Sequence, residues 1–209
     1  MKNKGLIFIL LGLLMWLCAI GLVAYNLCRQ QRAGEAKDEV LVQMLPQIPE
    51  VEEYIVIGPA EEDIEQVIPD YVLNPNMEMP TKEIDGRHYI GMLDIPDLDL
   101  VLPIISEWSY PALKIAPCRY EGSVYQGNLI IAAHNYNTHF GRLPQLPAGS
   151  RIRFTDMDGN EFIYEVVETE VIDPYGIDEM EAGDWDLTLF TCTVGGRTRF
   201  TVRCVLVQS

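Results

Sequence analysis

The hydrophobic pattern divides the chain into three parts. Residues 5–28 carry no charged side chain, and about 20 apolar residues in a helix suffice to cross a bilayer core. Residues 29–85 contain acidic residues and prolines, with little apolar periodicity apart from EYIVIG. After residue 85, short apolar runs alternate with turn residues. The pattern predicts a tail and transmembrane anchor over 1–28, an acidic stalk over 29–85 and a folded domain over 86–209.

The apolar run is longer than the core of a secretory signal, which favours an uncleaved anchor. Ala19 and Ala24 lie near its end, so cleavage stays open as an alternative. Basic residues flank the run on both sides, and the positive-inside rule therefore orients it only weakly. We expect a single-pass protein of the cell membrane with its domain outside, on a flexible stalk that includes a short helix around 59–67.

Within the domain, apolar and polar positions alternate in short runs, which is typical of β-strands. The turn DMDGN, built on Asp158 and Gly159, predicts a hairpin. Helical pieces are short and are expected over 110–115 and 141–146. Many short strands between turns indicate an all-β fold with short helices, a barrel or a sandwich. Strands are expected over 89–95, 98–105, 128–133, 151–154, 161–167, 170–173, 187–191 and 199–207.

Charge and cysteine content exclude several classes of function. The net charge of −16 argues against nucleic acid as a partner, because phosphate binding needs a basic surface. Three of the five cysteines lie in the domain: Cys118, Cys192 and Cys204. No CxxC spacing is present, which argues against a zinc site and against a redox protein. Cys118 and Cys204 could pair, but we expect buried, inert thiols.

Cys192 is the candidate nucleophile, because it ends the strand LTLFTC, and a reactive thiolate needs a base or cation nearby. His134 ends the apolar run NLIIAA and is well placed to face a groove; the alternative is a hydrogen-bonded structural histidine. His139 is expected to support the same loop. In RTRFTVRC, alternation places Arg197 and Arg199 on one strand face. An arginine there can donate to a developing oxyanion, although a solvated strand face is the alternative.

Three segments together resemble the sortase family. LTLFTC followed by RFTVRC is similar to the TLxTC…R signature of sortases, and NLIIAAHNYNTHFGRL is similar to their histidine segment. YIGMLDIPDLDLVLPI resembles their first two strands, so the likeness covers residues 86–207 in the right order. Sortases are cysteine transpeptidases of mainly Gram-positive surfaces. The resemblance therefore implies a sortase-type eight-stranded β-barrel behind an N-terminal transmembrane helix and a stalk.

The resemblance also implies roles for individual residues. Cys192 corresponds to the nucleophile, His134 to the general acid and base, and Arg199 to the group that holds the substrate and steadies the oxyanion. Ala133 stands where many members have glycine, and the loop after Cys192 is short, which leaves subclass and specificity open. Arg197 is the fallback for Arg199. Substrate contacts are expected from Arg197, Thr191, Asn135 and His139.

The implied reaction cleaves an LPxTG-like sorting motif through a thioester and joins the new carbonyl to an amine. The implied partners are surface proteins with a C-terminal sorting signal and, as acceptor, a peptidoglycan precursor or a pilin. Two alternatives stay open: a cysteine peptidase that releases the acyl group to water, and a non-catalytic surface assembly module. No cofactor is expected. The acidic stretch 173–186 leaves Ca²⁺ possible, because oxygen-rich clusters suit that ion, but a solvated loop is favoured.

Overall fold

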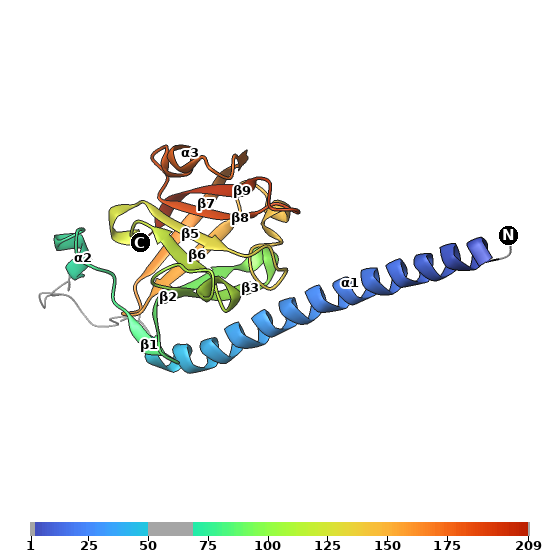
Figure 1. Cartoon of the computed structure of the whole chain (residues 1–209). Helices are drawn as coiled ribbons and strands as arrows, with labels where there is room; N and C mark the ends of the chain where they lie inside the picture. The colour runs from blue at the N-terminus through green and yellow to red at the C-terminus, as the bar shows by residue number, and fades with distance from the viewer. Residues whose placement is uncertain (1–2, 50–68, 209) are drawn as a thin grey trace, which may run out of the picture.

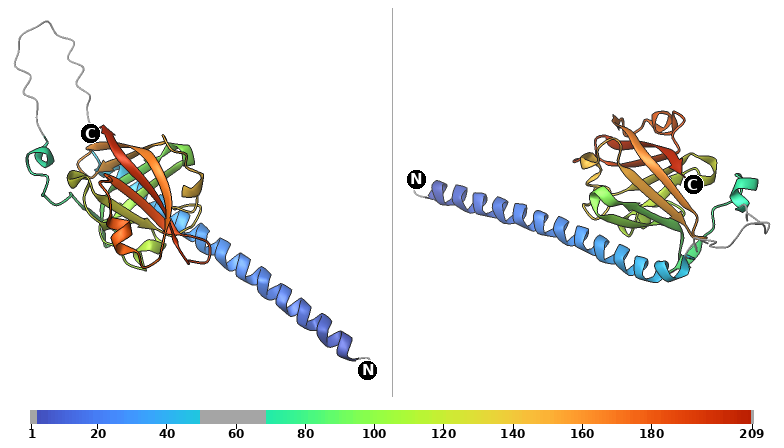
Figure 2. Two further views of the ribbon diagram at one scale, coloured as in Figure 1. Left: turned by 90° about the horizontal axis from the view of Figure 1, so that it is seen from above. Right: turned by 180° about the vertical axis from the view of Figure 1, so that it is seen from behind.

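A long helix and a β-barrel make up the described part of the chain, which covers residues 3–49 and 69–208 of the computed structural model (Figure 1). The expected short helix over 59–67 and the run EYIVIG lie outside these residues. The helix projects from one side of the barrel, and the N-terminus lies at its far end (Figures 1 and 2).

The strands form one nine-stranded sheet in the order β1-β2-β3-β4-β5-β8-β9-β7-β6. Strand β6 also pairs with β2, which closes the other eight strands into a barrel and leaves β1 on the outside. Closure leaves no free sheet edge within the ring. The predicted eight-stranded barrel is confirmed. The strands are β1 (Lys82–Ile84), β2 (Arg87–Ile95), β3 (Leu100–Ile105), β4 (Cys118–Glu121), β5 (Leu129–Ala133), β6 (Arg151–Asp156), β7 (Glu161–Ile172), β8 (Leu187–Cys192) and β9 (Arg199–Gln208).

The helices other than the first are short, as expected. The piece predicted over 110–115 contains the 3₁₀ turn η3, and the piece over 141–146 contains η5. The strand expected from residue 98 starts only at Leu100, because residues 96–98 form the 3₁₀ turn η2 and Asp99 adopts φ 49°. The helices are α1 (Asn3–Met44), α2 (Asp70–Leu73), α3 (Ile177–Glu181), η1 (Leu45–Gln47), η2 (Pro96–Leu98), η3 (Ala112–Lys114), η4 (Val124–Gln126) and η5 (Leu143–Gln145).

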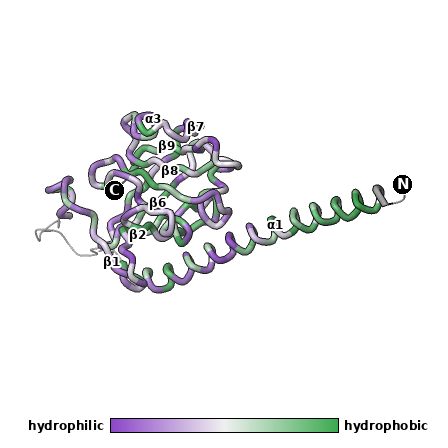
Figure 3. Tube along the Cα trace, in the orientation of Figure 1, coloured by the Kyte–Doolittle hydropathy of each residue, from purple (hydrophilic) through white to green (hydrophobic). Residues whose placement is uncertain are grey.

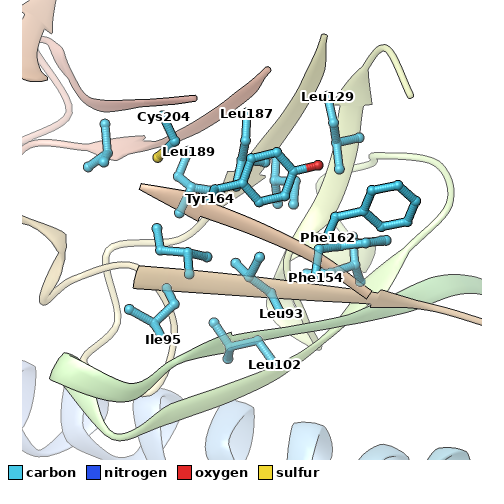
Figure 4. Close-up of a cluster of buried hydrophobic side chains, with 14 of the residues drawn as sticks. Leu93, Ile95, Leu102, Leu129, Phe154, Phe162, Tyr164, Leu187, Leu189 and Cys204 are labelled. Atoms are coloured by element: carbon cyan, nitrogen blue, oxygen red, sulfur yellow. The ribbon is translucent and has the colours of Figure 1, made fainter. Parts of the chain in front are cut away.

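Along each strand, side chains point alternately into and out of the barrel, and the inward-facing ones fill its interior. Burial of each such aliphatic or aromatic side chain is worth about 1.5–3 kcal/mol. Cys204 belongs to this interior and is fully buried. Figure 4 shows how side chains from facing strands meet there, among them Leu93, Ile95, Leu102, Leu129, Phe154, Phe162, Tyr164, Leu187 and Leu189.

The predicted hairpin joins β6 and β7, which pair antiparallel. The buried Asp156 organises its turn: one carboxylate oxygen accepts hydrogen bonds from the backbone N–H groups of Asp158 and Asn160, both at 2.9 Å. The other oxygen accepts from Tyr125 Oη at 2.7 Å. Gly159 adopts φ 88°, a left-handed conformation that favours glycine. The sequence signal and the local geometry therefore agree.

Helix α1 continues well past the apolar run and docks on the barrel. Figure 3 shows its N-terminal part as hydrophobic and its C-terminal part as mixed. By length and composition the helix is able to cross a membrane, and its apolar window has no buried residue. Ala33, Val40 and Met44 are buried, and their helical spacing places them on one face, which packs near β1 and β3.

The stalk expected over 29–85 is therefore not a flexible chain at its start. Residues 29–44 belong to α1, because their buried apolar face has the barrel to pack against. The end of the predicted stalk is also ordered, since β1 pairs with β2. In between, α2 docks through Tyr71, whose ring stacks on Tyr125 at 4.7 Å between centroids.

Candidate active site

Three neighbouring strands bring the predicted catalytic residues to one end of the barrel. Strands β5 and β8 are parallel and pair Ala133 with Thr191, so His134, the first residue after β5, lies beside Cys192, the last residue of β8. Strands β8 and β9 are antiparallel and pair Cys192 with Arg199. The Thr191 hydroxyl donates to the Ala133 carbonyl at 2.9 Å, which ties the two parallel strands together beside the site.

His134, Cys192 and Arg199 all line one pocket of about 190 Å³. Most of its other walls are aromatic or aliphatic, and such a hollow with a few convergent polar groups is typical of ligand sites. A larger, more polar cavity of about 370 Å³ shares Trp108 and Tyr120 with the pocket but contains none of the three predicted residues. The remaining walls of the smaller pocket are Tyr110, Leu113, Ala132, Ala133, Asp173, Pro174, Gly176, Ile177, Met180 and Phe190.

The aromatic walls were not foreseen from the sequence. Trp108 and Tyr110 lie in the loop after β3, and their rings meet edge to face at 5.8 Å between centroids. The Tyr120 and Phe190 rings meet in the same way at 5.4 Å. Loop aromatics give no periodic signal, and only the fold brings them to the pocket. No described residue between 29 and 85 lines the pocket, so that part of the predicted stalk does not cover it.

His134 sits in a dry environment that disfavours its charge. Its Nε2 is buried and has no hydrogen-bond partner among the described residues. Its ring packs on Tyr136 at 4.9 Å between centroids. Burial lowers the pKa of His134, and the positive charges of Arg29 and Lys114 lower it further. The free protein at neutral pH therefore holds a predominantly neutral imidazole beside Cys192.

Cys192 differs from the other two thiols of the domain. Cys192 is half-buried and opens into the pocket, whereas Cys118 and Cys204 are fully buried. Burial raises the pKa of both Cys118 and Cys204 to about 12, which keeps them protonated. All five cysteines are free, and Cys118 and Cys204 are unpaired and buried as expected, while their lack of reactivity stays a prediction.

The two candidate arginines take different positions. Arg199 is the first residue of β9 and lines the pocket, and its Nη1 donates to the carbonyls of Gly196 and Thr198, each at 3.3 Å. Arg197 is exposed in the turn between β8 and β9 and does not line the pocket. The geometry therefore favours Arg199 over Arg197 as the arginine that donates to the oxyanion.

The four predicted substrate-contact residues do not line the pocket. Thr191 is buried and serves the strand pairing, while Asn135 is exposed directly after His134. His139 is fully buried behind Tyr136, with 5.6 Å between ring centroids. Contacts of Thr191, Asn135, His139 and Arg197 with a bound substrate stay predictions.

Arg203 is a structural residue that the sequence pattern did not identify. It shares a strand face with Arg199, yet it is only 2% exposed, because the segment around α3 covers it. Its guanidinium donates to Glu170 Oε1 at 2.6 Å and to Thr188 Oγ1 at 3.0 Å. It also donates to the backbone carbonyls of Met180 at 2.7 Å and Glu179 at 2.6 Å. Arg203 thus fastens the α3 wall of the pocket to the barrel.

We predict that Arg203→Met lowers the free energy of unfolding by about 3 kcal/mol, because buried acceptors lose their donor. Denaturant unfolding measures the change. Arg151→Met is the matched control: Arg151 pairs with Glu165 at 3.2 Å on the surface, where such pairs contribute about 0–1 kcal/mol. Equal losses in the two variants would contradict the structural role of Arg203.

His139 makes stability depend on pH. Burial lowers the pKa of His139 to about 4, and the nearby His134 and Lys37 lower it as well. The backbone groups of Ile115 and Ala33 act in the opposite direction and raise this pKa. A histidine whose folded pKa is depressed stabilises the fold above its unfolded pKa of about 6.5, and this contribution is lost as pH falls towards 4. The difference corresponds to about 3 kcal/mol.

We therefore predict that His139→Leu flattens the pH dependence of unfolding between about 4 and 6.5. Chemical unfolding at a series of pH values measures the slope. His88→Leu, which replaces an exposed histidine, should keep the wild-type slope. A wild-type slope in His139→Leu would show that other groups carry the effect.

A metal site is not apparent in the described part of the chain. Across residues 3–49 and 69–208, no three histidine, cysteine or acidic side chains group closely enough to hold an ion. In the acidic stretch 173–186, the carbonyls of Glu179 and Met180 already accept hydrogen bonds from Arg203. The acidic side chains of this stretch form no such group among the described residues, and the preference for a solvated loop over a Ca²⁺ site stays a prediction.

Known proteins share this fold and its sequence features. Residues 93–207 match the family Sortase domain. A sortase D5 transpeptidase from Clostridium perfringens is similar at 25% identity and a TM-score of 0.52, over 61% of this chain and 83% of that one. A Clostridium perfringens sortase C structure with the C-terminal cell wall sorting motif is similar at 25% identity and a TM-score of 0.51, over 58% of this chain and 71% of that one.

Streptococcus pneumoniae sortase C shares the fold, with 20% identity and a TM-score of 0.51 over 61% of this chain and 72% of that one. No curated protein matches the sequence.

Proposed function

Since this chain belongs to the sortase family, we propose that it is a transpeptidase in which Cys192 is the nucleophile, His134 the general acid and base, and Arg199 the oxyanion donor. The observation that carries the proposal is the convergence of these three side chains on one pocket, from the ends of three neighbouring strands. Its substrate is a polypeptide with an LPxTG-like sorting motif.

In the first half of the reaction, Cys192 Sγ attacks a backbone carbonyl carbon of the motif. The carbonyl oxygen becomes an oxyanion, to which the Arg199 guanidinium donates; a donor placed in this way is commonly worth about 10²–10³ in rate. The proton from the thiol passes to the His134 imidazole, which gives it to the leaving amine. The carbon–nitrogen bond breaks, and a thioester on Cys192 remains.

In the second half, an amine attacks the thioester carbonyl. His134 accepts a proton from this amine, and the carbon–sulfur bond breaks, so that a new amide forms and the thiol is restored. We propose a peptidoglycan precursor or a pilin as the source of the amine. The apolar and aromatic walls of the pocket support the proposal, because they limit access of competing water to the thioester.

The electrostatics of the site imply a slow enzyme. Burial lowers the pKa of His134, so the thiolate–imidazolium pair is a minor species, and the neutral pair acts as its reservoir. Replacing Lys114, one of the two cations that lower this pKa, with glutamine should raise it. The acidic limb of the pH–rate profile should then move to higher pH. Initial rates across a pH series measure the shift, and a shift to lower pH would contradict this assignment.

The proposed setting is the outer face of the cell membrane. Residues 5–28 serve as a single-pass anchor, the N-terminal tail lies inside and the barrel outside. The partners are surface proteins with a C-terminal sorting signal. Support for this class of partner comes from the related Clostridium perfringens sortase C, whose structure contains the C-terminal cell wall sorting motif.

The experiment that tests this function compares product masses with and without an added amine. The full-length protein in detergent is incubated with a pool of LPxTG-like peptides, first alone and then with an amine acceptor. Peptide joined to the amine is the expected product. Hydrolysed peptide alone, even at high amine concentration, would favour the alternative of a cysteine peptidase.

A further inference from the structure

The anchor helix touches the loop that carries His134. The uncharged run of α1 ends at Cys28, and the next turn meets the loop: Thr138 Oγ1 donates to the Gln30 carbonyl at 3.4 Å. A Cβ placed on Gly34 would lie 3.0 Å from Thr138 Cγ2, so helix and loop pack closely. The catalytic loop therefore lies within about one helical turn of the end of the apolar run.

The contact extends along the helix and leaves little freedom between anchor and barrel. Ala33, Val40 and Met44 are buried on one face of α1. Lys37 Nζ donates to the Val101 carbonyl at 3.4 Å. Because α1 is continuous from residue 3 to residue 44, the direction of the apolar run fixes the direction of the barrel.

The register of the barrel shows which of its ends faces the apolar run. Strands β7 and β9 pair Ile172 with Arg199 at one end and Ile163 with Gln208 at the other. The C-terminus, next to Gln208, lies at the end away from the N-terminal part of α1 in Figure 1 and in both views of Figure 2. The end that holds Cys192 and Arg199 is therefore turned towards the apolar run.

The turn between β8 and β9, residues 193–198, projects from that end. At a rise of about 3.3 Å per residue its tip lies roughly 7 Å beyond Cys192, comparable to one turn of α1. Val194 at this tip is 97% exposed, and Arg197 beside it is also exposed. An apolar side chain next to an arginine suits the boundary between lipid tails and phosphates.

Aromatic side chains at the active-site end of the barrel also suit the boundary between lipid and water. Trp108 is 44% and Tyr110 73% exposed where they line the pocket, and tryptophan and tyrosine are enriched at membrane interfaces. At the end of the apolar run, the Arg29 guanidinium lies 5.7 Å from the Tyr25 ring centroid. Such an arginine and tyrosine mark the level of the headgroups on α1.

We propose that the active-site end of the barrel rests on the bilayer surface and that the turn 193–198 is a second membrane contact, with Val194 in the headgroup region and Arg197 at the lipid phosphates. The proposal rests on the proposed anchoring of residues 5–28. The pocket then opens beside the membrane, and the length of α1 sets the distance between the pocket and the bilayer surface.

Photo-crosslinking tests this contact without any need for catalysis. The full-length protein carrying Cys192→Ala is reconstituted into vesicles of phosphatidylglycerol and phosphatidylethanolamine, with benzoylphenylalanine in place of Val194. A matched variant carries the label at Asp158, an exposed residue in the turn at the opposite end, and a third carries it at Leu14 in the anchor. After irradiation, mass spectrometry should find lipid adducts at positions 194 and 14 and none at 158.

A second variant tests the role of the helix. A seven-residue helical insert after Cys28, about two turns, raises the barrel by roughly 10 Å and keeps its rotation. It should abolish the adduct at Val194 and retain that at Leu14. Adducts at Leu14 without any at Val194 in the uninserted protein would overturn the proposal, while the anchor would stand. Absence of an adduct at Leu14 would overturn the anchoring itself, and neither result depends on the proposed reaction.

Discussion

Cys192→Ala should abolish peptide joining, with a loss of at least about 10³-fold in turnover, because no other group in the pocket can form the thioester. Cys118 and Cys204 cannot substitute for it, since both are fully buried. The measurement is the initial rate of amine-dependent product formation by the full-length protein. Thermal unfolding should stay near the wild-type value, because Cys192 lies at a strand end and is only half-buried.

Two further measurements make this result specific. Cys28→Ala removes an exposed thiol of the anchor and should leave the rate unchanged. The Cys192→Ala protein should still bind the peptide, because the walls of the pocket are intact. Continued joining of peptides by Cys192→Ala would refute the assignment of the nucleophile.

Arg199→Ala should lower turnover by about 10²–10³-fold, the usual cost of removing one oxyanion donor. Arg199→Lys keeps the charge but loses the planar fork of donors, so an intermediate loss is expected. The decisive quantity is the rate of acyl-enzyme formation in a single turnover, which separates chemistry from substrate binding.

Arg197→Ala is the matched control for Arg199→Ala. Both changes remove one arginine from the same short segment, but Arg197 is exposed and does not line the pocket. Its loss should lower the rate of acyl-enzyme formation in detergent much less than the loss of Arg199, because Arg197 is exposed to solvent and outside the pocket. A larger loss in Arg197→Ala than in Arg199→Ala would exchange the roles of the two arginines.

The strands of the site were predictable because each carries a short-range signal. LTLFTC ends in Cys192 and NLIIAA is followed directly by His134, and the structure places Cys192 at the end of β8 and His134 directly after β5. The hairpin between β6 and β7 was predictable from Asp158-Gly159. Strand β4 was not predicted, because CRYE is short and its link to β3 is a single parallel pair, Ile105 with Cys118.

Other features depend on partners that are distant in the sequence. The docked part of α1 looked like a polar stalk, although Ala33, Val40, Leu41 and Met44 recur with helical spacing and could have indicated a buried face. The burial of Arg203 could not be predicted, since it needs the α3 segment to cover an outward-facing position. The strand pattern alone left a barrel or a sandwich open, and only the resemblance to sortases implied the closure that joins β2 to β6.

The proposed acyl-enzyme is tested most directly by the intact mass of the protein after brief incubation with sorting-motif peptides, before any acceptor amine is added. We predict an added mass equal to the acyl part of one peptide, located on Cys192 by peptide mapping. Hydroxylamine should remove this mass, as expected for a thioester. Product formation without any adduct on Cys192, or an adduct that resists hydroxylamine, would contradict the proposed acyl-enzyme.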